Sequence, residues 1–184
     1  MTKLAETIQK FSEQIFPEVV EHYHWLHRHP ELSYREKLTS EYICHFLEVE
    51  NIPYRKNIGG YGILAWVEGQ KPGKGKTLAF VADMDALPVQ EQNEVEYKSE
   101  NDGVMHACGH DVQSAAMMGA AKIVFSLRNE FSGTALFVFQ PGEEQSPGGA
   151  DLMLKDGVFR DFHPDFIVKQ HAYIDLPAGT VGFQ

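Results

Sequence analysis

The sequence predicts an α/β fold, with a central mostly parallel or mixed sheet and helices on both of its faces. Short apolar runs typical of buried strands alternate with segments in which apolar residues recur every three or four positions, the spacing of an amphipathic helix. Three of the strand-like runs end directly in acidic or imidazole side chains. Ligands of open α/β sheets bind at the carboxyl ends of the strands, so this pattern also predicts a functional site at one edge.

The composition excludes several classes of partner. The 184 residues are 43% hydrophobic and 23% charged, an ordinary globular balance that allows a sizeable core. The net charge is -10 and no basic patch is present, so nucleic acid is not an expected partner. No apolar run has membrane-spanning length and no signal-peptide core is found, so we expect no membrane partner. Two cysteines, Cys44 and Cys108, indicate free thiols in a reducing cytoplasm.

Two helices are predicted within the first fifty residues. The first runs from about Ala5 to His27, with Pro17 as a kink or break. The second begins at a capping box formed by Ser33 and Glu36 and continues to about Glu50. Four histidines lie at the end of the first helix and just after it, at a spacing that fits no single helical face, so we assign them to cap and surface roles rather than to a metal site. They are His22, His24, His27 and His29.

The rest of the chain alternates strands and helices. The predicted strands are 52–58, 61–67, 77–82, 134–139 and 166–170, with a further strand starting at about residue 179. The run 77–82 is expected to be a buried central strand, and 69–75 an exposed hairpin-type loop. A helix to about Leu127 carries small residues that predict close packing on a sheet, namely Ala115, Ala116, Gly119 and Ala120. A shorter helix is expected at 150–156.

Cys108 and His110 are separated by one glycine just before the helix that ends near Leu127. A thiolate and an imidazole at this spacing can converge on one metal ion, and Asp111 is placed to cap the helix or to orient His110. The other interpretation is a half-buried cysteine beside a helix cap. The remaining motifs decide between the two interpretations.

Further groups with metal or proton chemistry follow the strand-like runs. They are Asp83 and Asp85, Glu143 and Glu144, and His171. Neighbouring glutamates in an extended turn point in different directions, so one can hold a metal while the other acts as a general base. Cys, His, Glu and Asp together suit a divalent ion such as Zn²⁺, Mn²⁺, Co²⁺ or Ni²⁺. Such a centre lowers the pKa of water and polarises a carbonyl, as amide hydrolysis requires.

Five motifs resemble, in order, the signatures of one family. They are 26–33 (LHRHPELS), 82–88 (ADMDALP), 105–111 (MHACGHD), 139–144 (FQPGEE) and 176–182 (LPAGTVG). The family comprises the metal-dependent amidohydrolases and metallopeptidases related to aminoacylase and carboxypeptidase. The motifs resemble those of the branch that contains hippurate hydrolases, auxin-conjugate hydrolases and N-acetyldiaminopimelate deacetylases.

The resemblance implies a site with two divalent ions that cleaves a small N-acyl amino acid or short peptide. By position, Glu143 matches the general base, and Asp85 matches a catalytic-site aspartate that we expect to orient a ligand. The matched metal ligands are Cys108, His110, Glu144 and His171. The motif at 26–33 is a family mark without an assigned chemical role.

The sequence also departs from the family pattern. Val81 stands where the family usually has arginine, and Gln113 where it usually has histidine. Family members are longer, so we expect residues 1–184 to be the N-terminal, incomplete part of a zinc-peptidase-like catalytic domain. The lid domain, the returning part of the catalytic domain and a final histidine ligand would be absent. One metal ion or none would then bind, and a homodimer is expected only if the lid is not required for it.

Three hypotheses remain open at this point. The first is a metal-dependent amidohydrolase or a portion of one, with Glu143 as the base. The second is a truncated, inactive chain that binds metal or a partner chain. The third, a Cys108 nucleophile paired with His110, is disfavoured because residues this close in sequence have poor attack geometry.

Overall fold

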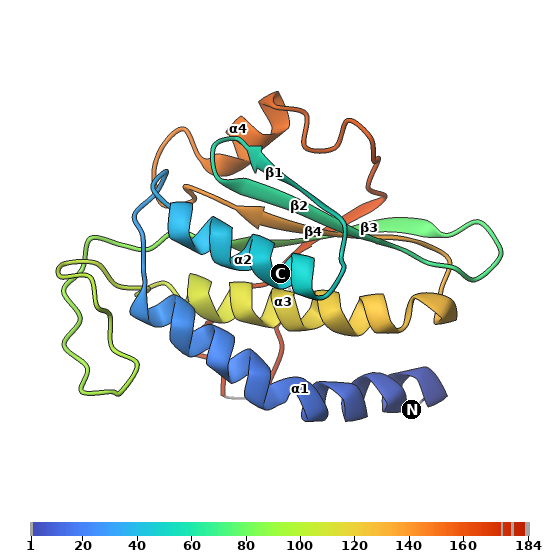
Figure 1. Ribbon diagram of the computed structural model, residues 1–184, viewed down its shortest axis with the longest axis horizontal. Coiled ribbons are helices and arrows are strands. Elements are labelled where there is room, and N and C mark those ends of the chain that lie inside the picture. The colour runs from blue at the N-terminus through green and yellow to red at the C-terminus, as the bar shows by residue number, and fades with distance from the viewer. Residues whose placement is uncertain (1, 174, 178, 183–184) are drawn as a thin grey trace.

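The computed structural model describes residues 2–173, 175–177 and 179–182. One five-stranded sheet with the order β1-β2-β4-β3-β5 forms its centre (Figure 1). The strands are β1 (Tyr54–Ile58), β2 (Gly62–Glu68), β3 (Lys76–Asp83), β4 (Gly133–Gln140) and β5 (Phe166–Lys169). The helices are α1 (Lys3–Arg28), α2 (Lys37–Val49), α3 (His110–Ser126), the 3-10 turn η1 (Arg128–Glu130) and α4 (Gly149–Lys155).

The sheet is mixed, as the sequence predicted. β3 is parallel to both β4 and β5, whereas β2 is antiparallel to β4 and to β1. β4 is the central strand and its last six residues are buried, while β3 lies one position away and is only partly buried. The hairpin predicted at 69–75 is wrong, because β4 pairs with both β2 and β3 and separates them.

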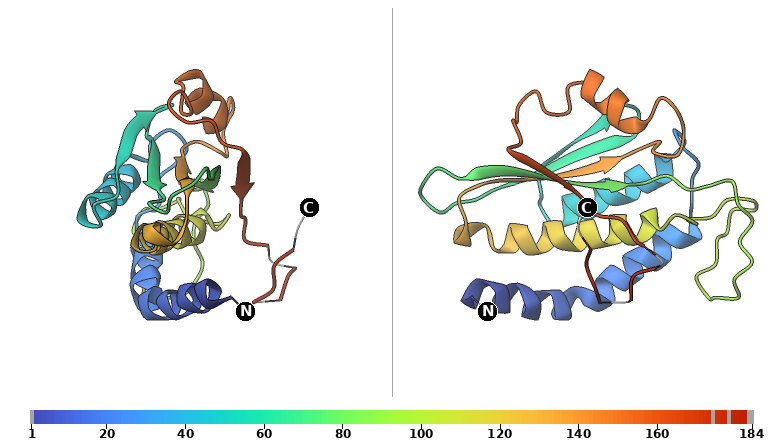
Figure 2. Two further views of the ribbon diagram at one scale, coloured as in Figure 1. Left: turned by 90° about the vertical axis from the view of Figure 1, so that its right-hand side faces the viewer. Right: turned by 180° about the vertical axis from the view of Figure 1, so that it is seen from behind.

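Helices cover both faces of the sheet (Figures 1 and 2). On one face α2 and α3 pack on the strands, and α1 packs on α3. Leu26, Ile43, Met118 and Phe137 belong to the core on this side. On the other face α4 places Met153 in a smaller core, together with apolar residues of β2, β3 and β4.

Local differences from the predicted helices have identifiable causes. α1 is a single helix that continues through Pro17, so the predicted break does not occur. α2 begins at Lys37 without a capping box, because Ser33 Oγ donates a hydrogen bond to Asp85 instead. The Glu31 carboxylate accepts the first-turn amides of α2, from Leu38 at 3.1 Å and from Thr39 at 2.8 Å. A negative charge is favourable at this end of a helix.

The four early histidines each contact a different neighbour. His22 shares a 2.8 Å hydrogen bond with the Tyr42 hydroxyl, and His24 stacks on the Tyr97 ring. His29 donates to the Trp25 carbonyl, while His27 is buried and contacts two carboxylates. The predicted cap and surface roles are wrong for His27, which is buried between two carboxylates.

The last part of the chain differs from its predicted structure. Gly179–Gly182 do not form the predicted strand and pair with no strand among the described residues. A strand needs a hydrogen-bonding neighbour, and Val181 is 80% exposed. The rest of that prediction, residues 183 and 184, lies outside the described residues. Elsewhere in the described part of the chain, no helix has the length and apolar character needed to cross a bilayer.

The small residues of α3 serve two different surfaces. Ala115 is buried in the core, but Ala116 and Ala120 are exposed, so only part of the predicted packing is found. Gly119 faces α1, where a Cβ atom would lie 2.7 Å from Val19 Cγ2. The absence of a side chain at Gly119 therefore sets the distance between α1 and α3.

We expect Gly119→Ala to lower the free energy of unfolding by about 1 kcal/mol, because overpacking against Val19 outweighs the gain in helix propensity. In a Val19→Ala background the same change should stabilise the chain, since the clash is removed. Urea denaturation of the four proteins measures both effects. A destabilisation of equal size in both backgrounds would contradict this account.

Candidate metal centre

The site lies where three parallel strands end. The carboxyl ends of β3, β4 and β5 share one edge of the sheet, and the N-terminus of α3 lies beside them. Two groups of side chains have donor atoms that all lie within 4.8 Å of one another. They are Cys108, His110 and His171, and His110, Glu143 and Glu144. His110 belongs to both groups, so the two form one continuous cluster.

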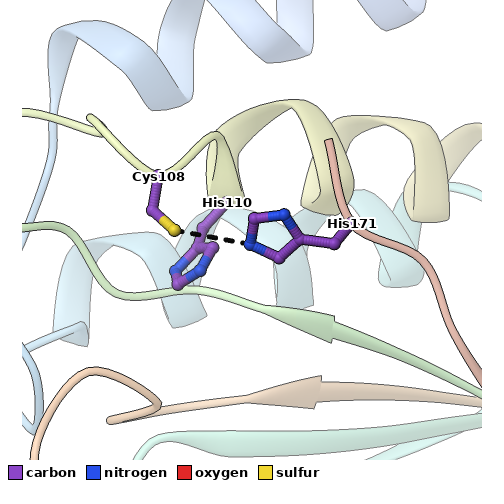
Figure 3. A group of neighbouring side chains, drawn as sticks. All are labelled: Cys108, His110 and His171. Carbon is purple, nitrogen blue, oxygen red and sulfur yellow. Dashed lines mark hydrogen bonds between the residues drawn. The ribbon is translucent and has the colours of Figure 1, made fainter. Parts of the chain in front are cut away.

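The turn before α3 positions the cysteine and the histidine. Gly109 adopts a left-handed conformation (φ 81°), which glycine accepts without the cost of a Cβ atom. Cys108 therefore lies on the loop and His110 in the first turn of α3, and both point toward His171 from the segment after β5 (Figure 3). Cys108 Sγ is 3.4 Å from His171 Nε2.

Hydrogen bonds fix the tautomer of both imidazoles. His110 Nδ1 donates to the Asp85 carbonyl at 2.8 Å, and His171 Nδ1 donates to the Ala172 carbonyl at 2.6 Å. In the neutral form of each ring, Nε2 therefore carries the lone pair, and it faces the cluster. A backbone carbonyl on the other ring nitrogen is the usual way in which a metal-ligating histidine is oriented.

The donor set fits a divalent metal ion. His110 is 1% exposed, and its Nε2 has no hydrogen-bond partner among the residues that the structure describes. A buried imidazole nitrogen without a partner costs free energy unless another group binds it. Thiol, imidazole and carboxylate ligands around this atom are those that Zn²⁺ and similar ions prefer.

Asp85 joins several parts of the site. Its Oδ2 accepts a hydrogen bond from Ser33 Oγ at 2.6 Å and from the amide of Glu144 at 2.9 Å, and its Oδ1 is 3.3 Å from His110 Nδ1. Burial raises the pKa of Asp85, but these donors outweigh burial and lower the pKa to about 2. The carboxylate therefore stays charged and orients both His110 and the Glu144 backbone.

Asp111 does not orient His110, contrary to one of its two predicted roles. It does not cap α3 either, because Gly109 is the cap residue and the helix has no side-chain cap hydrogen bond. Its Oδ1 accepts the amide of the next residue, Val112, at 2.8 Å, while its Oδ2 accepts from His27 Nδ1 at 2.6 Å. His27 Nε2 lies 3.1 Å from Glu91 Oε1. The hydrogen bond to Asp111 raises the pKa of His27, against the effect of burial. The motif at 26–33 thus has a structural role in connecting α1 to α3.

Sequence reasoning missed the role of Glu36, which it interpreted as part of a capping box. Glu36 is fully buried, and its Oε1 accepts the amide of Gly142 at 2.7 Å and that of Tyr34 at 2.9 Å. It therefore anchors the loop that carries Glu143. Burial raises the pKa of Glu36 to about 7, although the backbone hydrogen bonds act in the opposite direction. The sequence shows only an acidic residue just before a helix, which does not reveal that the side chain is buried.

Lys169 is the second missed residue. Its Nζ lies 2.8 Å from Asp83 Oδ2 and 3.5 Å from Glu143 Oε1. Val81, one of the departures from the family pattern, pairs directly with Lys169 across β3 and β5. The other departure, Gln113, accepts the Asp83 amide through Oε1 at 3.4 Å.

Comparisons with known proteins show the family of the chain. The family model described as peptidase family M20/M25/M40 matches residues 79–184, more than half of the chain. An N-acyl-L-amino acid amidohydrolase from Geobacillus stearothermophilus is 38% identical over 99% of this chain and 48% of its own length. Thermostable carboxypeptidase 2 of Saccharolobus solfataricus is 36% identical over 96% of this chain and 44% of its own length.

A solved structure gives the same fold. The YXEP protein of Bacillus subtilis, described as a dinuclear metal-binding peptidase of family M20, matches with a TM-score of 0.85 and 37% identity. The match covers 94% of this chain and 47% of that protein. The chain belongs to the peptidase family M20/M25/M40. It spans about half the length of the curated relatives that it matches.

We expect the stability of the chain to depend on pH through Glu36. Its folded pKa of about 7 lies above the unfolded value of 4.5, so its contribution is greatest below pH 4.5 and is lost as the pH rises to about 7. Glu36→Gln keeps an oxygen acceptor and removes this loss. It should raise the free energy of unfolding at pH 8 by up to ~3 kcal/mol.

Urea denaturation between pH 4 and pH 8 measures this effect, with Glu41→Gln on the exposed face of α2 as the control for charge. If the difference between Glu36→Gln and the unchanged chain were constant over this range, the assigned role of Glu36 burial would be wrong.

The cluster also predicts the metal affinity of the chain. Cys108→Ser should weaken the binding of Zn²⁺ by at least about tenfold, because a soft thiolate ligand is lost. Cys44 lies in the core, so Cys44→Ala controls for the loss of a thiol elsewhere. Calorimetric titration gives the affinities, and equal values for both variants would place the metal at another site.

Proposed function

We propose that the chain carries metal-binding and catalytic groups of an enzyme that hydrolyses the amide bond of an N-acyl amino acid or a short peptide. The convergence of Cys108, His110, His171 and the adjacent glutamates on one edge of the sheet is the observation that carries this proposal. Family membership supports it, as do relatives named N-acyl-L-amino acid amidohydrolase and N-acetylcysteine deacetylase.

The residues proposed to hold the metal are Cys108, His110, Glu144 and His171. Two divalent ions in a complete site agree with the description of the related Bacillus subtilis protein, and Zn²⁺, Mn²⁺, Co²⁺ or Ni²⁺ suits these ligands. When bound, the metal would supply a water of lowered pKa and polarise the substrate carbonyl. Glu144 is oriented toward the cluster, with Oε1 4.0 Å from His110 Nε2.

Glu143 is proposed to move the proton. Its side chain is 37% exposed, so its carboxylate is accessible to water and substrate at the edge of the cluster. It would accept a proton from the attacking water and then transfer that proton to the leaving amine nitrogen. Asp85 would act indirectly, by holding His110 and the Glu144 backbone in place.

The alternative in which Cys108 is a nucleophile has little support. Its Sγ is directed at His171 rather than at His110. Burial, followed by the negative charges of Glu144, Glu143 and Asp83, raises the pKa of the Cys108 thiol to about 11. A nucleophilic cysteine needs a lowered pKa. A bound cation would offset the same negative charges, which favours the role of a metal ligand.

Residues 1–184 are proposed to correspond to the N-terminal part of the catalytic domain, because the chain spans about half of its relatives. A reducing cytoplasm would suit the free thiols of Cys44 and Cys108. A homodimer, expected only if the lid domain is not required for it, stays a prediction from the sequence.

We expect Glu143→Gln to lower the rate of hydrolysis of N-acetyl amino acids by about 10²–10⁴-fold, because the general base is lost. Its affinity for Zn²⁺ should change little. Glu144→Gln is the matched control, for which we expect weaker metal binding. Release of free amino acid from a panel of N-acyl amino acids and dipeptides measures activity.

The same measurements distinguish a chain that does not catalyse hydrolysis from a wrong assignment of Glu143. If the unchanged chain binds metal but hydrolyses no compound in the panel, then this chain is a metal-binding protein without catalysis. If Glu143→Gln retains full activity, the proton is moved by another group.

A further inference from the structure

A lysine from the edge strand β5 lies at the acidic end of the sheet. Lys169 Nζ contacts Asp83 Oδ2 at 2.8 Å and Glu143 Oε1 at 3.5 Å. Asp83 is the last residue of β3, whereas Glu143 lies in the loop after β4. One ammonium group therefore connects carboxylates from two separate segments of the site.

Asp83 has few other sources of stabilisation. It is 0% exposed, and apart from the Lys169 ammonium no group in the described part of the chain donates a hydrogen bond to its side-chain oxygens. Nearby Asp85, by contrast, accepts from Ser33 and from the Glu144 amide. The next basic atom is His110 Nε2, 3.9 Å from Asp83 Oδ2. A buried carboxylate without a counter-ion costs several kcal/mol, so the charge of Asp83 depends on Lys169.

We propose that Lys169 is a positioning residue of the metal centre, anchored by Asp83 and holding the Glu143 carboxylate at the edge of the ligand cluster. Asp83 acts as the fixed partner because it is completely buried, whereas the Glu143 side chain is 37% exposed. The part that concerns Glu143 rests on the proposed function. The part that concerns Asp83 rests only on burial and charge.

The sheet supports this position of the ammonium. Lys169 lies opposite Val81 in the parallel pairing of β3 and β5, and directly paired residues project toward the same face. Asp83, two residues after Val81, lies on that face as well. The lysine side chain therefore extends along the strand direction toward the end of β3, where the carboxylates lie.

A fixed positive charge here also affects metal binding. Lys169 neutralises part of the charge of Asp83 and Glu143, and its ammonium repels a divalent cation held by the adjacent ligands. Removing the lysine should therefore increase the affinity for a metal ion, while it decreases the stability of the metal-free chain. Opposite effects on the two quantities distinguish this role from a general loss of structure.

The experiment compares the melting temperature of the unchanged chain and its variants in the presence of a chelator. Lys169→Met should lower the melting temperature by about 5 °C or more. Lys169→Arg keeps the positive charge and should lower the melting temperature much less. Asp83→Asn added to Lys169→Met should recover part of the loss, because no buried charge is then left unpaired. Lys76→Met is the matched control.

Lys76 forms a 2.7 Å ion pair with Asp165, which likewise links β3 to the segment at β5, but the Lys76 side chain is 68% exposed. An exposed pair contributes little, so Lys76→Met should shift the melting temperature by less than about 2 °C. Titration with Mn²⁺ then measures affinity, which we expect to rise severalfold in Lys169→Met and to stay unchanged in Lys76→Met.

Equal melting temperatures for Lys169→Met and Lys76→Met would overturn the proposal, as would a failure of Asp83→Asn to recover any stability. An unchanged Mn²⁺ affinity in a destabilised Lys169→Met would overturn the link to the metal centre. The melting experiment needs neither metal nor turnover. If the unchanged chain binds no Mn²⁺, the proposed function fails. The melting temperatures of the variants still test whether Lys169 stabilises the buried Asp83 carboxylate.

Discussion

The hydrogen bonds of Asp85 hold the site together. This buried carboxylate follows β3 and accepts from Ser33, before α2, and from the Glu144 backbone, after β4. The same residue accepts from His110 through its carbonyl oxygen. Segments that are distant in sequence therefore meet at one charged group, whose donors outweigh the cost of its burial. The orientation of the exposed parts of the cluster depends on this buried contact.

Much of the fold could be predicted because the local pattern and the final structure agree. The apolar runs formed strands, and the acidic and imidazole residues at their ends met at one edge, as parallel strands require. The strand order could not be predicted, because the apolar pattern of β4 does not say which strands it pairs with. The same limit produced the wrong hairpin between β2 and β3.

The errors at the site have a common physical cause. Ser33, Glu36 and Asp111 each suggested a local contact in a helix cap. The structure gives each of them a contact with a residue at least 50 positions away. Ser and Asp side chains can bond to the local backbone or to a distant partner, and the Glu36 carboxylate accepts both the nearby Tyr34 amide and the distant Gly142 amide, so spacing alone could not decide. Lys169 was missed because an exposed edge strand gives no sign of a buried carboxylate beside it.

The insertion of β4 between β2 and β3 also affects how the chain folds. β2 and β3 are consecutive along the sequence, but both depend on a strand that begins at Gly133. The pairing of each of these strands with β4 requires contacts across more than fifty residues, which slows folding relative to a sheet of simple hairpins. The loop that bears Glu143 directly follows β4, so the acidic part of the cluster assembles only when this strand has entered the sheet. During synthesis, the N-terminal helices therefore emerge well before the sheet that they cover can form.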